Sequence, residues 1–293
     1  TVFDGHSSGL AQGKKIVIED DIVTEITADE VSEENFDEVF DGTGMVAMPG
    51  MTDAHVHMGC LFAKGEFPVD YATVLTVAKC KDALMAGFTT FRDAGSVSEG
   101  LKLAFDEGVL PGPRIYPCGA YISQTCGHGD SEYAHTYRDI QYRHPSSTVL
   151  ADGVPEIIRA VREQFYRGAS HIKLMATEIL NRHEDIRLLF GTDMMITGPD
   201  YQVEQSEDIR YYEKRFGTMR ALRALTGTAN EVFALTTYQN PYPKGKIGVL
   251  EAGSYADLLL VDGDPTKSVS VLADTDHLRL IMKGGTVYKN TLC

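Results

Sequence analysis

The sequence predicts an α/β fold, with a parallel sheet or barrel in the middle of the chain and short antiparallel strands at both ends. Helical and extended patterns alternate between residues 71 and 176, an order typical of parallel sheets. The two ends instead carry short runs in which apolar and polar residues alternate. We therefore expect a barrel domain over 49–248 and a second domain formed by 1–48 together with 249–293.

Both ends of the chain have the pattern of small β-strands. Runs rich in isoleucine, valine and leucine are flanked by charged residues, a composition that favours strands. The expected strands are 14–20, 21–27, 36–42, 257–261 and 278–288. Gly284-Gly285 interrupts the last of these runs and is typical of a hairpin turn. Two β-rich ends around an α/β middle predict one small β-sandwich formed by both termini.

The middle of the chain repeats a helix followed by a strand. In the first repeat Val74, Leu75 and Ala78 have helical spacing, and Gly87 marks the end of the helix. The expected helices are 71–86, 97–107 and 154–167. The expected strands are 88–93, 115–119, 171–176 and the short run 188–190. This rhythm indicates parallel strands connected by helices.

Two histidines two residues apart point to a metal site. His55 and His57 follow the turn signal Pro49-Gly50, in an extended segment that also contains Asp53. Residues i and i+2 of a strand face the same side, so both imidazoles project into one space and can bind one metal ion. The pair would lie at the C-terminal end of its strand, where barrel enzymes keep their chemistry.

Three charged residues near strand ends are expected to be structural. Arg92 and Asp93 end the strand 88–93 and are typical of an ion pair or a loop anchor. Asp257 begins the strand 257–261 and is expected to tie this returning strand to the sandwich.

Composition narrows the class of protein. The formal charge of −15 over 293 residues argues against nucleic acid or an anionic membrane as a partner. The five cysteines lack CxxC and zinc-finger spacing, so no disulfide scaffold is expected. No apolar run approaches the 18 residues of a membrane span. Because Thr1 opens no signal-peptide pattern, we expect a cytoplasmic protein, or a periplasmic bacterial one if a leader precedes Thr1.

Seven segments, in order, resemble the amidohydrolase superfamily of metal-dependent hydrolases. The chain is most similar to its branch of prolidase-like and Xaa-Arg-type dipeptidases, imidazolonepropionase-like proteins and ochratoxin-type amide hydrolases. The resemblance implies a (β/α)8 barrel for the α/β core. The segments are PGMTDAHVHMG (49–59), GFTTFRDAG (87–95), GPRIYPCG (112–119), ISQTCGHGD (122–130), GASHIKLMAT (168–177), FGTDMM (190–195) and GVLEAGSYADLLLVDGDP (248–265).

The resemblance also assigns roles to the candidate site residues. His55 and His57 would bind one of two divalent metal ions, expected to be Zn²⁺, with Mn²⁺ or Co²⁺ as alternatives. Lys173, a lysine expected to face inward where a bare charge is costly, would carry a CO2-derived carbamate that bridges both ions. Asp193 would be a metal ligand and the general base. His128, in a glycine-rich loop, would bind substrate and polarise its carbonyl, with Asp130 orienting it.

The chain departs from the family pattern after Lys173. By resemblance Lys173 ends the fourth barrel strand and Asp193 the eighth, yet they are 20 residues apart. Three further βα units of roughly 30 residues each cannot fit there. We therefore expect about three units to be missing near 177–181, together with two more metal-binding histidines, and the whole polypeptide to be longer than 293 residues. His183 lies in a polar stretch and is not expected to be a ligand.

These observations predict a metal-dependent hydrolase of amide or peptide C–N bonds. The expected substrates are small molecules, namely dipeptides or N-acyl amino acids, and a homo-oligomer is expected. The nearest alternatives in the same superfamily are hydrolysis of cyclic amides of the imidazolone type and deamination. The alternative from another class is an inactive, metal-free barrel scaffold, which metal analysis of the purified protein would distinguish.

Overall fold

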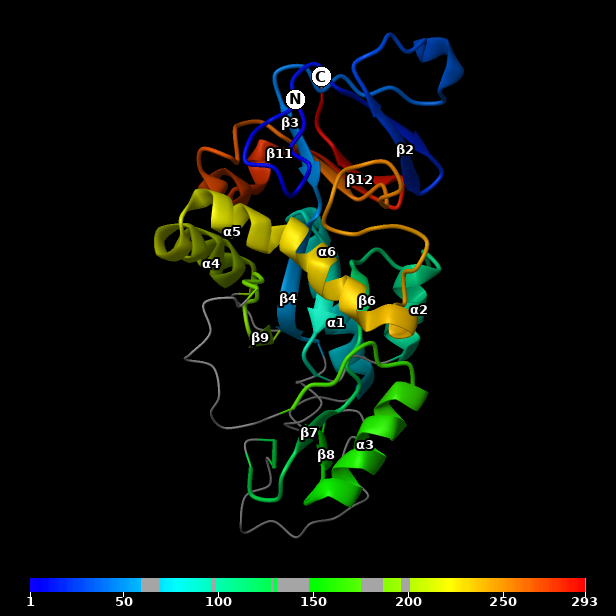
Figure 1. Cartoon of the computed structure of the whole chain (residues 1–293), viewed down its shortest axis with the longest axis vertical. Coiled ribbons are helices and arrows are strands. Elements are labelled where there is room, and N and C mark those ends of the chain that lie inside the picture. The colour runs from blue at the N-terminus through cyan, green and yellow to red at the C-terminus, as the bar shows by residue number, and fades with distance from the viewer. Residues whose placement is uncertain are drawn as a thin grey trace.

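The computed structural model describes residues 1–58, 69–95, 99–127, 129–130, 148–174, 187–195 and 201–292. Along its long axis the molecule has three parts (Figure 1). Strands from both ends of the chain lie at the pole that holds the N- and C-termini. A parallel sheet with helices occupies the middle, and one helix with two short strands forms the opposite pole.

A four-stranded parallel sheet is the centre of the fold, with the order β6-β5-β4-β9. Its strands are β6 (Arg114–Tyr116), β5 (Phe88–Asp93), β4 (Met51–His57) and β9 (Met194–Met195). Nearly every residue of β4 and β5 is buried, as expected for a parallel sheet whose two faces are covered. The α/β class and the strand expected at 88–93 are thereby confirmed. A closed eight-stranded barrel stays a prediction.

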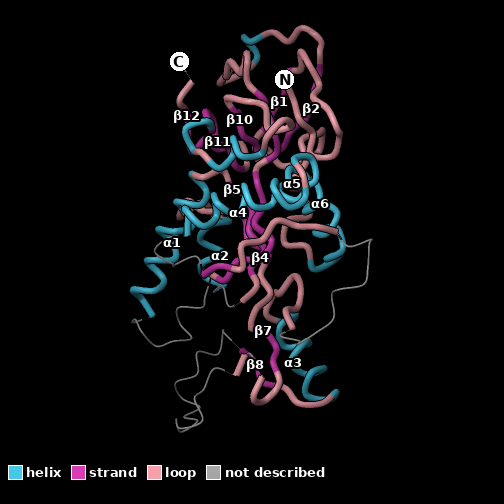
Figure 2. The backbone as a smooth tube through the Cα atoms, turned by 90° about the vertical axis from the view of Figure 1, so that its left-hand side faces the viewer, coloured by secondary structure: helices cyan, strands magenta, loops and turns pink. Residues whose placement is uncertain are grey.

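Helices pack on this sheet from different sides. The helices are α1 (Val69–Met85), α2 (Glu99–Asp106), α4 (Tyr201–Phe216), α5 (Thr218–Leu225) and α6 (Gly227–Phe233). Figure 2 shows α1 and α2 on one side of β4 and α6 on the other. The shared core buries Leu84 of α1, Phe88 and Phe91 of β5, and Leu222 of α5, each worth about 1.5–3 kcal/mol. None of the helices in the described part of the chain is both long and apolar enough to span a membrane.

The pole opposite the termini carries the segment of Lys173. There β7 (Tyr121–Ser123) pairs in parallel with β8 (Thr148–Leu150), and α3 (Val154–Tyr166) packs beside them. Ile122 of β7 forms a single bridge with Leu174, and its N–H donates to the Lys173 carbonyl at 2.9 Å. The sequence predicts a strand at 171–176. Over the described residues 171–174 the structure has only an isolated β-bridge, because the backbone pairs with β7 at a single position.

The strands from the two ends of the chain pair with one another. They are β1 (Lys15–Glu19), β2 (Ile22–Thr27), β3 (Val46–Pro49), β10 (Leu258–Val261), β11 (Leu278–Lys283) and β12 (Thr286–Asn290). β1 and β2 form a hairpin, and the other four form an antiparallel sheet of order β12-β11-β10-β3. The hairpin expected at Gly284-Gly285 is confirmed, and both glycines have the positive φ that such a turn requires. Whether this layer is a separate domain stays a prediction.

Several expected strands differ in the structure. Residues 36–42 form no strand, because most of this acidic run is exposed, although Phe40 packs against the core of the terminal sheet. β6 ends at Tyr116 rather than at 119. Residues 188–190 are irregular, and the strand of this region is β9, which begins one residue after Asp193. Short 3₁₀ segments lie at Glu33–Asn35, Ala234–Gln239, Val269–Ala273 and Thr275–His277.

A buried ion pair joins the central sheet to the terminal sheet. Arg114 of β6 donates from Nε to Asp257 Oδ2 at 2.8 Å and from Nη2 to Asp257 Oδ1 at 3.2 Å. The same carboxylate accepts the Gly284 N–H at 2.7 Å. The guanidinium also lies 3.8 Å from the ring centre of Tyr255. The expectation that Asp257 is structural is confirmed, and its partners show that it ties the terminal sheet to the central one.

Removal of the arginine should unfold the protein more easily. Arg114→Met leaves the Asp257 carboxylate buried without its bidentate partner, so the free energy of unfolding should fall by about 3–5 kcal/mol. Urea titration followed by circular dichroism measures this change. The matched control is Arg187→Met, because the Arg187–Glu231 pair is about half exposed and is worth at most about 1 kcal/mol. Equal effects of the two variants would contradict the role of the buried pair.

Lys283, next to this ion pair, should make stability depend on pH. Its Nζ donates to the Gly112 carbonyl at 2.7 Å, and burial lowers its pKa to about 8 although Asp257 raises it. Between pH 8 and the ordinary lysine pKa of 10.5 the unfolded chain binds more protons, so stability rises with pH. Relative to Lys283→Met, the wild type should gain about 2 kcal/mol of unfolding free energy between pH 7 and 9.5. Parallel pH profiles of the two proteins would contradict this.

Candidate metal centre

Strand β4 presents its two histidines side by side at its C-terminal end. The alternation of a strand places His55 and His57 on one face, with ring centres 5.4 Å apart. The His57 side chain is 10% exposed and that of His55 is 35% exposed, so both are partly shielded yet reachable from solvent. The shared face that the sequence predicted is therefore present.

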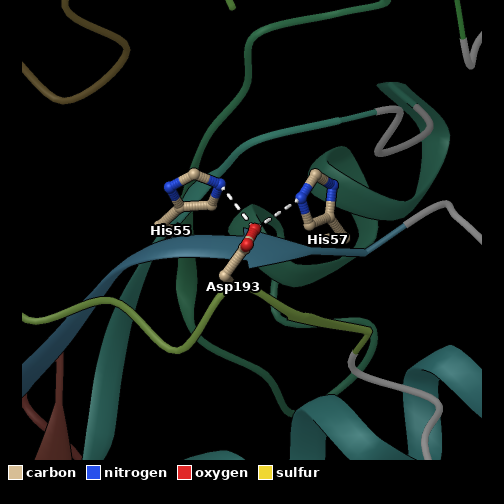
Figure 3. Close-up of side chains that lie close together, drawn as sticks. All are labelled: His55, His57 and Asp193. Carbon is tan, nitrogen blue, oxygen red and sulfur yellow. Dashed lines mark hydrogen bonds and ion pairs between the residues drawn. The ribbon is translucent and has the colours of Figure 1, made fainter. Parts of the chain in front are cut away.

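Asp193 reaches the two imidazoles from a segment far along the chain. Its Oδ1 lies 2.9 Å from His55 Nε2 and 3.1 Å from His57 Nε2, and Figure 3 shows the carboxylate between the two rings. The Asp193 N–H donates to the His55 carbonyl at 2.7 Å. Gly191 permits this approach, since a Cβ there would lie 2.7 Å from His55 Cβ.

Lys173 is a fourth side chain in this group and contacts His55. Its Nζ lies 3.0 Å from His55 Nε2. Burial, followed by the charge of Lys173, lowers the pKa of His55 to about 4, although Asp193 raises it. His55 is therefore neutral near pH 7 and keeps one nitrogen lone pair, as a metal ligand must. The structure thus brings together the four residues that the sequence proposed as ligands: His55, His57, Lys173 and Asp193.

The donor set fits a divalent cation. Ligand atoms of His55, His57 and Asp193 all lie within 4.8 Å of one another. Imidazole nitrogen and carboxylate oxygen are ordinary ligands of Zn²⁺ and similar ions. In addition, one neutral His55 Nε2 cannot both donate to Asp193 and accept from Lys173, although it contacts both. A cation between the histidines and the carboxylate would remove this conflict, because it accepts the lone pairs of all three.

The buried carboxylate of Asp53 binds the backbone beside two of the candidate ligands, His55 and Asp193. Its carboxylate is fully buried and accepts hydrogen bonds from the His55 amide, from the amide and hydroxyl of Thr192, and from the Gln205 side chain in α4. Burial raises the pKa of Asp53 to about 6, and these donors oppose the shift. The alternation of a strand predicts that Asp53, two residues before His55, lies on the face of the histidines. The contributions of Thr192 and Gln205 had no signal in the sequence.

Asp93 binds the backbone of the loop after β4 and also contacts His171, in the segment that carries Lys173. Its Oδ1 accepts the Met58 N–H at 3.2 Å, directly after His57, which confirms the loop-anchor interpretation. Its backbone carbonyl lies 3.1 Å from His171 Nε2, and the other ring nitrogen lies 3.0 Å from the Ser170 hydroxyl. His171 therefore links the strand end of β5 to the segment that carries Lys173.

Several predicted residues lie outside the described part of the chain. They are His128, His183 and the region of the expected gap at 177–181. Of the loop around position 128, the structure describes both ends. Gly129 N–H donates to the Ser123 hydroxyl, and Cys126 N–H donates to Asp130 Oδ2 at 2.8 Å. The roles of His128 and Asp130 toward a substrate stay predictions.

Part of the chain is similar in sequence to known proteins. A model of the amidohydrolase family matches residues 46–186. An ochratoxinase from Aspergillus niger is 34% identical over 152 residues, which cover 45% of this chain and 31% of that protein. The chain thus matches less than a third of the length of this curated relative.

Solved structures share the fold over nearly the whole chain. A crystal structure of an amidohydrolase has a TM-score of 0.85 and 23% identity, and the match covers 100% of this chain and 98% of that one. A prolidase complexed with N-methylphosphonate-L-proline has a TM-score of 0.79 and 21% identity, covering 94% and 95%. The chain therefore shares the fold of these solved structures, and its residues 46–186 are similar in sequence to the amidohydrolase family.

Proposed function

We propose that the protein is a metal-dependent hydrolase of amide or peptide C–N bonds in small molecules. The observation that carries the proposal is the convergence of His55, His57 and Asp193 at the C-terminal end of β4, with Lys173 in contact with His55. The match to the amidohydrolase family model and the likenesses to an ochratoxinase and a prolidase support it. Within the proposal, dipeptides or N-acyl amino acids are the substrates, and residues 49–248 belong to a (β/α)8 barrel capped by a terminal β-sandwich.

The proposed cofactor is a pair of divalent metal ions, which are Zn²⁺ or, alternatively, Mn²⁺ or Co²⁺. His55, His57 and Asp193 would hold it, and when bound it would supply a Lewis acid that makes hydroxide accessible near neutral pH. A lysine ammonium 3.0 Å from His55 Nε2 would repel a cation there. Reaction of the neutral Lys173 amine with CO2 forms an N–C bond, releases one proton and leaves a carbamate anion. This supports the carbamate at Lys173.

Asp193 is the residue best placed to move protons. Its side chain is 73% exposed while Oδ1 contacts both imidazoles, so one carboxylate meets the metal ligands and the solvent together. It can accept a proton from an attacking water and pass it to the leaving nitrogen, the usual task of a general base that later acts as an acid. In the proposal His128 binds the substrate and polarises its carbonyl.

The histidine pair should be required for metal binding. His55→Ala/His57→Ala removes two of the three converging ligands, so the purified protein should lose most of its bound metal after incubation with Zn²⁺ and dialysis. Elemental analysis measures the content. His277→Ala is the matched control, because His277 is only partly exposed, lies in the 3₁₀ segment before β11, and contacts the Asp262 backbone carbonyl through Nδ1. A double variant with full metal content would overturn the assignment.

Asp193→Asn should abolish turnover and leave the fold intact. Asparagine keeps the shape of the side chain but cannot carry the proton, and loss of a general base costs roughly 10²–10⁴ in rate. The exposed position of Asp193 predicts an unchanged thermal midpoint. The rate is measured on a panel of dipeptides and N-acyl amino acids with Zn²⁺, Mn²⁺ or Co²⁺ added. A variant within about twofold of wild type would reject this role.

A further inference from the structure

The Asp53 carboxylate connects three separate segments at the back of the candidate metal centre. Its Oδ1 accepts the N–H of His55 at 3.2 Å and the N–H of Thr192 at 3.3 Å. Its Oδ2 accepts the Thr192 hydroxyl at 2.9 Å and Gln205 Nε2 at 3.3 Å. The side chain is 0% exposed. A buried carboxylate needs such donors, and each bond to it is stronger than one between neutral groups.

The donors adjoin the residues that form the centre. Thr192 immediately precedes Asp193, and the His55 amide belongs to a proposed ligand itself. Asp193 has a φ of 56°, in the left-handed region that residues with a Cβ adopt infrequently. Asp193 N–H is fixed to the His55 carbonyl, and the preceding residue is fixed to Asp53. Both residues of this turn are therefore attached to β4, and the attachments hold the turn in its unusual conformation.

We propose that Asp53 and Thr192 are positioning residues that set the distance between the His55 imidazole and the Asp193 carboxylate. They act through the backbone, because their hydrogen bonds fix the His55 amide and the residue that precedes Asp193. The proposal rests on the proposed function for the identity of the site. It adds that metal affinity depends on a hydroxyl that binds no metal. Such supporting hydrogen bonds typically change metal affinity by 10- to 100-fold.

The test is the Zn²⁺ affinity of the metal-free full chain, measured by competition with a chromophoric chelator. Thr192→Val removes the hydroxyl at constant volume and should weaken binding about 10-fold, whereas Thr192→Ser, which keeps the hydroxyl, should stay within twofold of wild type. Asp53→Asn removes an acceptor and should weaken binding by about 10- to 100-fold. Circular dichroism and thermal melting confirm that each variant is folded during the titration.

A matched control separates positioning from general stability. Thr226 is also a fully buried threonine, and its hydroxyl donates to the Leu222 carbonyl at 2.7 Å, away from the centre. Thr226→Val should lower the thermal midpoint and keep the Zn²⁺ affinity of wild type. Thr192→Val binding within twofold of wild type, or equal losses in Thr192→Val and Thr226→Val, would overturn the proposal.

The loaded enzyme gives a second measurement. Misplacement of Asp193 should lower kcat of Thr192→Val several-fold with little change in KM, because the substrate contacts stay in place. If the wild type binds Zn²⁺ through His55 and His57 but hydrolyses no amide, the proposed function fails and the affinity series alone decides the positioning role. If Zn²⁺ binding by the wild type is insensitive to His55→Ala/His57→Ala, the positioning role is overturned as well.

Discussion

The pairing of residues 190–195 with β4 is the constraint on which the candidate centre depends. Ala54 N–H donates to the Phe190 carbonyl at 2.8 Å, and Asp193 N–H donates to the His55 carbonyl at 2.7 Å. β9 then continues beside the end of β4. Because backbone bonds fix this register, a carboxylate 136 residues from His57 arrives within 3.1 Å of it. A shift of one residue would direct the Asp193 side chain elsewhere.

Electrostatics then make the four side chains interdependent. His55 contacts a potential cation at Lys173 and an anion at Asp193 through one nitrogen. Burial and Lys173 keep that imidazole neutral, so a lone pair remains for a metal ion. The neighbouring cation opposes the same ion. Lys173 and a bound metal ion are compatible at this distance only if Lys173 carries no positive charge. The proposed carbamate on Lys173 is thereby linked to the proposed metal.

The terminal strands support the centre from a distance. Arg114 lies on β6, two strands from β4, and its bidentate bond to Asp257 fixes the central sheet to β10. Gly50 connects β3 of the terminal sheet directly to β4, and a Cβ there would lie 2.1 Å from the Thr89 hydroxyl of β5. Both connections attach the terminal sheet to the central sheet, and the strand that carries both histidines begins directly after Gly50.

The sequence by itself determined those features that follow from local periodicity and turn chemistry. The two-residue period of a strand placed His55 and His57 on one face, helical spacing and Gly87 defined α1, and Gly284-Gly285 defined a hairpin. Only the tertiary structure decided that 36–42 stays outside any sheet, that β9 follows Asp193, and that Thr192 and Gln205 converge on Asp53. The contacts of Thr192 and Gln205 with Asp53 and the place of β9 depend on hydrogen bonds between residues more than a hundred positions apart. Within the described part of the chain, residues 36–42 have no neighbouring strand to pair with. No local sequence pattern encodes either condition.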